Sequence, residues 1–175
     1  MDNYPDRTAY LCDAIDSLGL PHDAAILELG CACGRNLAEL HRRGYRNLTG
    51  VDVSPGYVQA LWELHPELAA YSIIIAPAEQ VVAGLNDNAM DAVFSLACLM
   101  HIPPENEWAF AEIARIARHV VCLEHETASN RLAFPRDYGA IFTALGFTEL
   151  RSEFCNTDNA HMREYRLRIF RKERP

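Results

Sequence analysis

The sequence has no apolar run that approaches the roughly 18 residues needed to cross a membrane, so no membrane partner is expected. It also has no excess of basic residues, because 16 lysines and arginines stand against 24 aspartates and glutamates and give a net charge of −8. General nucleic-acid binding needs a basic surface, and nucleic acid is therefore not an expected partner. Residues 1–9 are polar and charged and do not resemble a secretory signal, which predicts a cytoplasmic protein.

The pattern of cysteines is not that of a disulfide-stabilised or metal-binding protein. Most of the six cysteines fall in apolar stretches that read as strands or helices, which is typical of reduced, buried thiols. Cys31 and Cys33 form a C-x-C pair, and only Cys98 is expected to approach them. We therefore expect small apolar filler here and no metal site.

The chain of 175 residues, half of them hydrophobic, is long enough for one domain with a substantial core. We expect an N-terminal helix within residues 1–20, alternating strands and helices in 21–145, and a β-hairpin in 146–175. Strands are predicted at 25–30, 47–52, 71–76, 90–96, 119–124, 147–154 and 164–171, and helices at 6–18, 35–43, from 55 onward, 78–83, 104–116 and 137–145.

Alternating strands and helices form a parallel sheet with helices on both faces. The last two strands are joined by the polar segment 155–163 and should pair antiparallel. The predicted fold is therefore α/β: a doubly wound, mostly parallel, seven-stranded sheet with a C-terminal antiparallel hairpin. Two details are also predicted. Val58, Leu61 and Trp62 should share one face of a helix, and a solvated strand face and tail, or alternatively a site for an anionic partner, should be formed by Arg166, Arg168, Arg171 and Lys172.

Residues 26–36, Ile-Leu-Glu-Leu-Gly-Cys-Ala-Cys-Gly-Arg-Asn, are the centre of the functional interpretation. They read as a strand, a glycine-rich turn and the start of a helix, an arrangement that brings backbone and a helix N-terminus close to a ligand. About twenty residues later Asp52 ends the next strand, where an acid suits a pair of ribose hydroxyls. This combination predicts a site for a nucleotide-like cofactor.

Over residues 20–172 the sequence resembles the class I S-adenosylmethionine-dependent methyltransferases. Glu28-Leu29-Gly30-Cys31-Ala32-Cys33-Gly34 resembles the first motif of that family, acid-x-Gly-x-Gly-x-Gly. The runs 50–54, 78–79, 91–94 and 100–103 resemble the segments at its second, third and fourth strands. The resemblance implies S-adenosyl-L-methionine as the methyl donor and S-adenosyl-L-homocysteine as the product.

The resemblance also implies roles for individual residues. The residues implied to bind the donor are Glu28, Gly30, Cys31, Gly34, Asp52, Val53, Ala78, Glu79, Ser95 and Leu96, and those implied in catalysis are His101 and Glu124. Glu28 would meet the methionine ammonium, and Asp52 both ribose hydroxyls. His101 would accept a proton from the methyl acceptor; alternatively it is a structural histidine bonded to loop backbone. Glu124 is either a second base or a strand-end carboxylate that caps a loop, and Asp52 could instead cap the helix that follows it.

Two positions depart from the family pattern. Ala32 replaces the middle glycine of the first motif, and Pro77 stands where many relatives carry the Asp that binds the adenine amino group. Adenine would then be held by backbone groups, by apolar packing or by Glu79. These departures leave open a non-catalytic partner subunit that keeps the fold.

A nicotinamide-dependent oxidoreductase is the remaining alternative. Its fingerprint, G-x-G-x-x-G, would fall on Gly30, Ala32 and Arg35, and only the first position fits. We therefore expect direct methyl transfer to an oxygen or nitrogen of a small acceptor. No separate cap domain fits in this length, so the acceptor pocket is expected to be open, to be completed by a homodimer or another chain, or to take a large acceptor.

Overall fold

The computed structural model describes residues 5–127, 132–155 and 163–172. Its strands are β1 (Ala25–Leu29), β2 (Asn47–Asp52), β3 (Ser72–Ile75), β4 (Met90–Leu96), β5 (Ala117–Glu124), β6 (Phe147–Phe154) and β7 (Arg166–Lys172). The α-helices are α1 (Pro5–Asp16), α2 (Arg35–Arg42), α3 (Pro55–Leu64), α4 (Ala78–Gly84), α5 (Trp108–Ile116) and α6 (Tyr138–Ala144). Three short 3₁₀ helices are η1 (Pro66–Ala70), η2 (Leu99–His101) and η3 (Pro104–Asn106).

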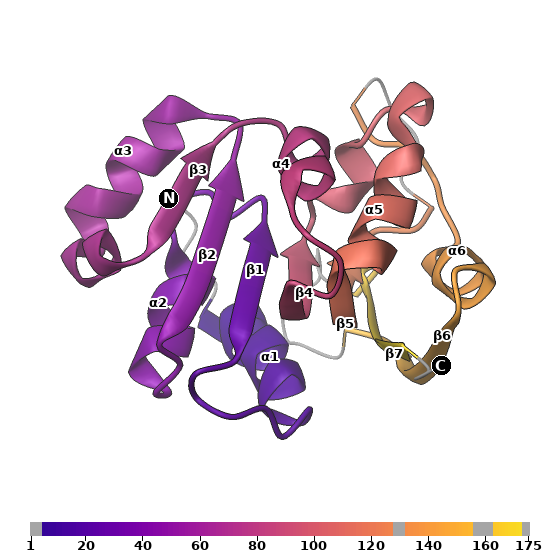
Figure 1. Cartoon of the computed structure of the whole chain (residues 1–175), viewed down its shortest axis with the longest axis horizontal. Coiled ribbons are helices and arrows are strands. Elements are labelled where there is room, and N and C mark those ends of the chain that lie inside the picture. Colours follow the sequence, from indigo (N-terminus) through magenta and orange to yellow (C-terminus); the bar gives the residue numbers. More distant parts are fainter. Residues whose placement is uncertain (1–4, 128–131, 156–162, 173–175) are drawn as a thin grey trace.

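The strands form one sheet in the order β3-β2-β1-β4-β5-β7-β6, and Figure 1 shows them side by side in that order. Neighbouring strands from β3 to β5 are parallel, whereas β7 is antiparallel to both β5 and β6. The predicted fold is confirmed. The chain leaves β1 toward one edge of the sheet and later returns to β4 on the other side of β1, and ligands of such sheets bind beyond the strand ends at this reversal.

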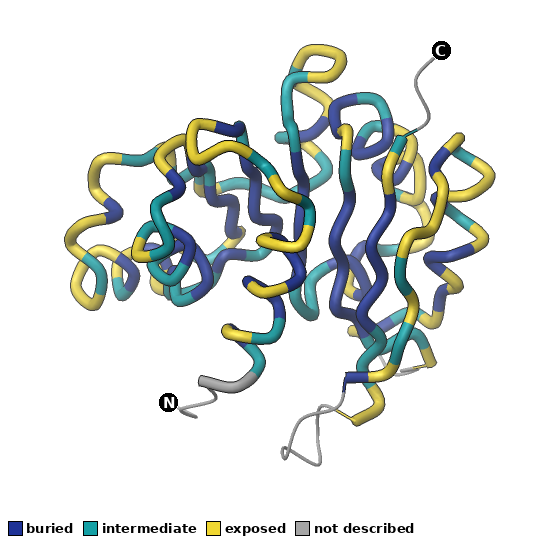
Figure 2. The backbone as a smooth tube through the Cα atoms, turned by 90° about the horizontal axis from the view of Figure 1, so that it is seen from below, coloured by how far each residue is buried: buried dark blue, intermediate teal, exposed yellow. Residues whose placement is uncertain are grey.

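Apolar side chains pack on both faces of the sheet. One cluster joins α1, α2 and α3 to the sheet through residues such as Leu11, Leu37 and Leu61. The other cluster joins α4, α5 and α6 through Val82, Phe110 and Phe142. Figure 2 shows the result, with buried strands in the middle and exposed residues on the outer helices. A parallel sheet covered on both faces holds the ends of its strands rigidly, which positions whatever lies beyond them.

The structure corrects three details of the sequence prediction. The helix predicted at 104–116 begins as η3, in which Asn106 and Glu107 bond to carbonyls three residues back, and becomes α-helical only at Trp108. Trp62 is 45% exposed although Leu61 is buried, because one step along a helix turns a side chain by about 100°. The structure also contains the 3₁₀ turn η1, in a segment for which no element was predicted.

Arg168 is the third correction, because it is not part of a solvated face. Its side chain is 9% exposed and lies among three carboxylates. It binds Glu126 through two nitrogens, at 2.5 and 3.1 Å, and Glu149 at 2.6 Å. The strand β7 is therefore fixed to the segment that follows β5 by this ion network. The sequence pattern of one strand does not show which charged residues from other segments will meet it.

All six cysteines are free thiols, and four of them are buried. Among the described residues no helix is long and apolar enough to span a membrane.

Candidate active site

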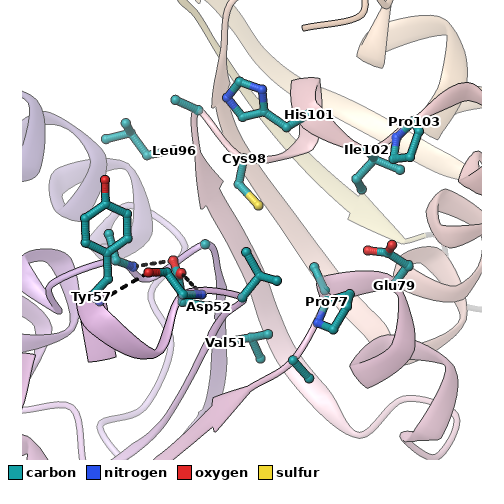
Figure 3. Close-up of a pocket in the computed structure, with 17 residues that line it drawn as sticks. Val51, Asp52, Tyr57, Pro77, Glu79, Leu96, Cys98, His101, Ile102 and Pro103 are labelled. Carbon is teal, nitrogen blue, oxygen red and sulfur yellow. Dashed lines mark hydrogen bonds between the residues drawn. The ribbon is translucent and has the colours of Figure 1, made fainter. Parts of the chain in front are cut away.

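A cavity of about 630 Å³ lies at the carboxyl ends of β1, β2 and β4 (Figure 3). This size is typical of sites for cofactors and drug-sized ligands. Its lining is formed by Gly30, Ala32, Val51, Asp52, Val53, Ser54, Tyr57, Ala76, Pro77, Ala78, Glu79, Leu96, Ala97, Cys98, His101, Ile102 and Pro103. The cavity therefore occupies the place where the strand order reverses.

The turn after β1 follows the cavity wall because Gly30 and Ala32, which line the cavity, adopt left-handed backbone conformations. Gly30 has φ +76°, and a Cβ there would lie 2.6 Å from the Cβ of Cys98. Ala32 has φ +45°, which strains a residue with a side chain by about 1–2 kcal/mol. Gly30 N donates to the Val51 carbonyl at 2.8 Å, so the turn is also fixed to β2.

Asp52 closes this turn from the end of β2. One carboxylate oxygen accepts the Ala32 N–H and the other accepts the Ser54 N–H, each at 2.8 Å. These two bonds hold the strained Ala32 in place and leave further lone pairs on both oxygens for a ligand. Asp52 does not cap α3, because Ser54 is the N-cap of that helix and accepts from Tyr57 N.

Glu28 lies two residues before the turn and is 1% exposed. Its Oε1 accepts from Asn36 at 2.7 Å, and Asn36 in turn accepts from Thr8. Its Oε2 is buried without a hydrogen-bond partner among the described residues. Burial outweighs the Asn36 bond and raises the pKa of Glu28 to about 8. An unpaired buried oxygen is costly, and a ligand ammonium would satisfy it.

Glu79 lies across the cavity from Asp52, next to Pro77 at the start of α4 (Figure 3). Asn106 donates to its Oε1 at 2.9 Å. Its Oε2 has no hydrogen-bond partner in the described parts of the chain, so it can still accept a bond from a ligand.

His101 belongs to the segment 96–103 on the third side of the cavity (Figure 3). Its Nδ1 contacts the carbonyl oxygen of Leu132. Because a carbonyl can only accept, Nδ1 carries the hydrogen, and the neutral form of the ring would then have its lone pair on Nε2. No described residue bonds Nε2, so this nitrogen can bond a ligand.

Glu124 has no exposed surface and does not line the cavity. Its carboxylate accepts from Ser95 Oγ and from the backbone N–H groups of Cys98, Leu99 and Met100, at 2.7–3.2 Å. Burial raises the pKa of Glu124 even though all four hydrogen bonds favour the ionised form. Its position is that of a carboxylate that caps a loop, which was the alternative reading of the sequence.

A family model described as a methyltransferase domain matches residues 27–120 of the chain. The chain belongs to this methyltransferase-domain family. S-adenosylmethionine is accordingly its methyl donor. All the residues that line the cavity, including Gly30 and Asp52, lie within the matched region.

Three solved structures show how widely this methyltransferase fold is shared. The N-methyltransferase NodS from Bradyrhizobium japonicum WM9 is 21% identical, with a TM-score of 0.78 over 99% of this chain and 100% of that one. Magnesium protoporphyrin IX methyltransferase (ChlM) from Synechocystis PCC 6803, with bound S-adenosylhomocysteine, is 18% identical, with a TM-score of 0.72 over 94% and 80%. The [4+2]-cyclase SpnF is 16% identical, with a TM-score of 0.74 over 94% and 81%. A search of curated protein sequences gave no significant match.

The cavity of the methyltransferase brings together only some of the residues singled out in the sequence. Those that line it are Gly30, Asp52, Val53, Ala78, Glu79, Leu96 and His101, whereas Glu28, Cys31, Gly34, Ser95 and Glu124 lie outside the lining. Gly34 packs against α3, where a Cβ would lie 2.5 Å from Leu61. Ser95 is bonded to Glu124, and Cys31 N to the Val51 carbonyl.

Several lining residues were not singled out, among them Tyr57, Ala76, Cys98 and Ile102. Tyr57 is half exposed at the start of α3. The position after Ser54-Pro55-Gly56 could have pointed to it, because the first turn of a helix that follows β2 must face the strand ends. Ile102 lies in the run 100–103 that resembles the family, but it was not named as a site residue, since its apolar side chain looks like core.

The donor fits the residues that are present. The cavity has the volume for the donor, and Asp52 offers carboxylate oxygens. The buried Oε2 of Glu28 has no hydrogen-bond partner among the described residues, and the donor's ammonium can bond to it. S-adenosylmethionine supplies an activated methyl group on a sulfonium, so the chain itself must orient the reactants and exclude water.

Proposed function

We propose that this methyltransferase transfers the methyl group directly to an oxygen or nitrogen of a small acceptor, with His101 as the base. The observation that carries the proposal is the tautomer of His101. Its Nδ1 bonds to the Leu132 carbonyl, which leaves Nε2 as the nitrogen that can take a proton, and His101 lines the cavity. A neutral imidazole can take a proton from a hydroxyl or an amine.

The donor would be held by residues from three strand ends. Asp52 accepts the ribose hydroxyls, Glu28 faces the ammonium, directly or through water, and the Oε2 of Glu79 accepts the adenine amino group in place of the Asp that Pro77 replaces. Backbone at Gly30, Cys31, Val53, Ala78 and Leu96 surrounds the remaining donor atoms. Gly34 and Ser95 support this site by packing and by the bond to Glu124, respectively.

The cavity is open to solvent beside the end of β2. Val53 and Tyr57 there are 67% and 55% exposed, and apolar surface at a pocket mouth favours a binding partner. We expect a second copy or another chain to complete the pocket. Light scattering of the purified protein measures its oligomeric state and so tests for a second copy. The free cysteines fit a reducing compartment such as the cytoplasm.

Calorimetry separates the main hypotheses. We expect S-adenosylhomocysteine to bind and NAD not to bind. Binding of NAD alone would overturn the proposal, and donor binding without turnover of any acceptor would leave only the non-catalytic subunit.

A labelled-donor screen over alcohols, phenols, amines and carboxylates then tests the chemistry. With an acceptor found, His101→Ala should lower kcat by about 10²–10⁴-fold, the usual contribution of a general base. His22→Ala is the matched control, because His22 is exposed and lies outside the cavity. Full activity of His101→Ala would remove His101 as the base.

A further inference from the structure

The segment that carries His101 is a single turn of 3₁₀ helix, η2, between Cys98 and Ile102. A turn this short has no stability of its own, because helix nucleation is unfavourable. Its N–H groups at one end and its carbonyls at the other also need partners. What supplies those partners decides where the imidazole lies.

Glu124 supplies them at the N-terminal end of η2. Its two oxygens accept the N–H groups of Cys98, Leu99 and Met100, and Ser95 adds a fourth bond. A negative charge at a helix N-terminus is favourable. The carboxylate is completely buried and so cannot exchange these partners for water.

Arg136 supplies them at the C-terminal end. Its side chain is 3% exposed and donates to the Ile102 carbonyl at 2.6 Å and to the Leu99 carbonyl at 3.4 Å. The guanidinium lies 5.2 Å from the ring centroid of Phe110 and 5.7 Å from that of Phe134, which fixes its plane. A positive charge at a helix C-terminus is likewise favourable.

The chain around Arg136 also reaches the imidazole itself. Phe134 N donates to the Met100 carbonyl at 2.9 Å, and the Leu132 carbonyl accepts from His101 Nδ1. One segment, 132–136, therefore fixes both the turn and the ring that projects from it. Buried ions are costly unless fully paired. Glu124 is paired with Ser95 and with the N–H groups of this turn, and Arg136 with the carbonyls of the turn and with Glu107 Oε1 at 3.4 Å.

We propose that Glu124 and Arg136 are positioning residues that clamp η2 from its two ends, so that the Leu132 carbonyl holds His101 in the Nδ1–H tautomer. The inference rests on the proposed role of His101 and goes beyond it, because it assigns the cause of the tautomer. Neither ion touches a ligand, and both act through the turn.

The first test is the tautomer of His101 in the protein saturated with S-adenosylhomocysteine. Long-range ¹H–¹⁵N spectra of histidine-labelled protein distinguish the two ring nitrogens, and the His101→Gln spectrum assigns the signal among the seven histidines. At pH 8 we expect a protonated Nδ1 and an unprotonated Nε2. A protonated Nε2, or an even mixture, would overturn the proposal.

The second test uses Glu124→Gln and Arg136→Lys. Each should convert His101 to a mixture of tautomers, with the dissociation constant for S-adenosylhomocysteine changed less than threefold. Glu105→Gln and Arg118→Lys are the matched controls at exposed positions and should keep the Nδ1–H tautomer. An unchanged tautomer in both clamp variants would contradict the clamp.

A third measurement needs no variant, in case the clamp variants fail to fold. The amide hydrogens of Cys98, Leu99 and Met100 should exchange at least tenfold more slowly than that of Glu105, which lies in the neighbouring exposed turn. Equal exchange rates for these amides and that of Glu105 would contradict the proposed clamp. Full turnover of His101→Gln would instead remove the base and leave the tautomer result standing, so the two proposals fail separately.

Discussion

The two sides of the cavity are built in different ways. On the donor side, the turn after β1 is fixed to the adjacent strand β2 by bonds such as that from Ala32 to Asp52, twenty residues away. On the side that we propose for the acceptor, η2 is held by Glu124, Leu132 and Arg136. These residues come 24 to 37 residues later in the chain than the residues of the turn that they bind, from Met100–Glu124 to Leu99–Arg136. The donor side is therefore a short motif, and the acceptor side a tertiary assembly.

This difference shows why a family can be read from a sequence while an acceptor cannot. The same fold is shared by structures described as methyltransferases and by one described as a cyclase. Substitutions on the donor side should alter donor affinity, whereas those on the acceptor side should leave it nearly unchanged. The five predictions that follow test this contrast from the largest expected effect to the smallest.

Asp52→Ala should weaken S-adenosylhomocysteine binding by at least a hundredfold, or about 3 kcal/mol, because hydrogen bonds to a charged group contribute about 1.5–3 kcal/mol each. Calorimetry measures the dissociation constant. Asp23→Ala is the control, because Asp23 is exposed and outside the cavity. Unchanged affinity in Asp52→Ala would show that Asp52 does not hold the ribose.

Gly30→Ala should lower the free energy of unfolding by about 3 kcal/mol, since a left-handed backbone and an overpacked contact each cost about 1–3 kcal/mol. Gly30 is the point where the donor turn touches the acceptor segment, at Cys98. Urea denaturation measures the change. In Gly84→Ala, where an added Cβ meets nothing within 4 Å, we expect no loss; equal losses in the two variants would contradict the contact.

The affinity for S-adenosylhomocysteine should rise between about pH 6 and 8 by up to tenfold per pH unit. The pKa of Glu28 is raised to about 8 by burial, so below that pH the carboxyl keeps its proton, which a ligand ammonium must displace. Above that pH the affinity should level off. Glu28→Gln should remove this slope, and the same slope in both proteins would exclude Glu28 as the ammonium partner.

Glu79→Gln should weaken S-adenosylhomocysteine binding by about five- to tenfold, the share of one hydrogen bond to a charged group. The same substitution should weaken binding of the inosine analogue much less, because that ligand lacks the adenine amino group. Glu63→Gln, in α3 and outside the cavity, is the control. An equal loss for both ligands would assign adenine recognition to other groups.

Ala32→Gly should change the free energy of unfolding by less than about 1 kcal/mol. Relief of the left-handed strain at φ +45° is offset by the greater freedom of glycine in the unfolded chain. Thermal unfolding with and without S-adenosylhomocysteine measures the change in stability of the free protein and of the ligand complex. A loss of more than a few kcal/mol would mean that the Ala32 methyl group packs against an essential neighbour.

The elements of the fold followed from local patterns in the sequence. Periodic apolar residues predicted the strands and helices, and Ser54-Pro55 correctly marked the start of α3. Trp62 and Arg168 were misplaced, because the burial of one side chain depends on neighbours from distant segments. A loop was predicted at residues 155–163, and positions 156–162 of it lie outside the described residues.

The sequence by itself determined the family and the mostly parallel sheet with its antiparallel end, and it marked the turn at Gly30 and the acid Asp52, because a strand, a glycine turn and an acid at the next strand end are local features with fixed geometry. Only the tertiary structure decided which titratable groups reach the cavity. Glu124 and His101 looked alike as candidate bases in the sequence. In the fold Glu124 is buried beneath the turn and accepts hydrogen bonds from Ser95 and from three backbone N–H groups, whereas His101 lies on that turn and lines the cavity. That outcome depends on contacts between β5, the segment 132–136 and η2, which no local pattern encodes.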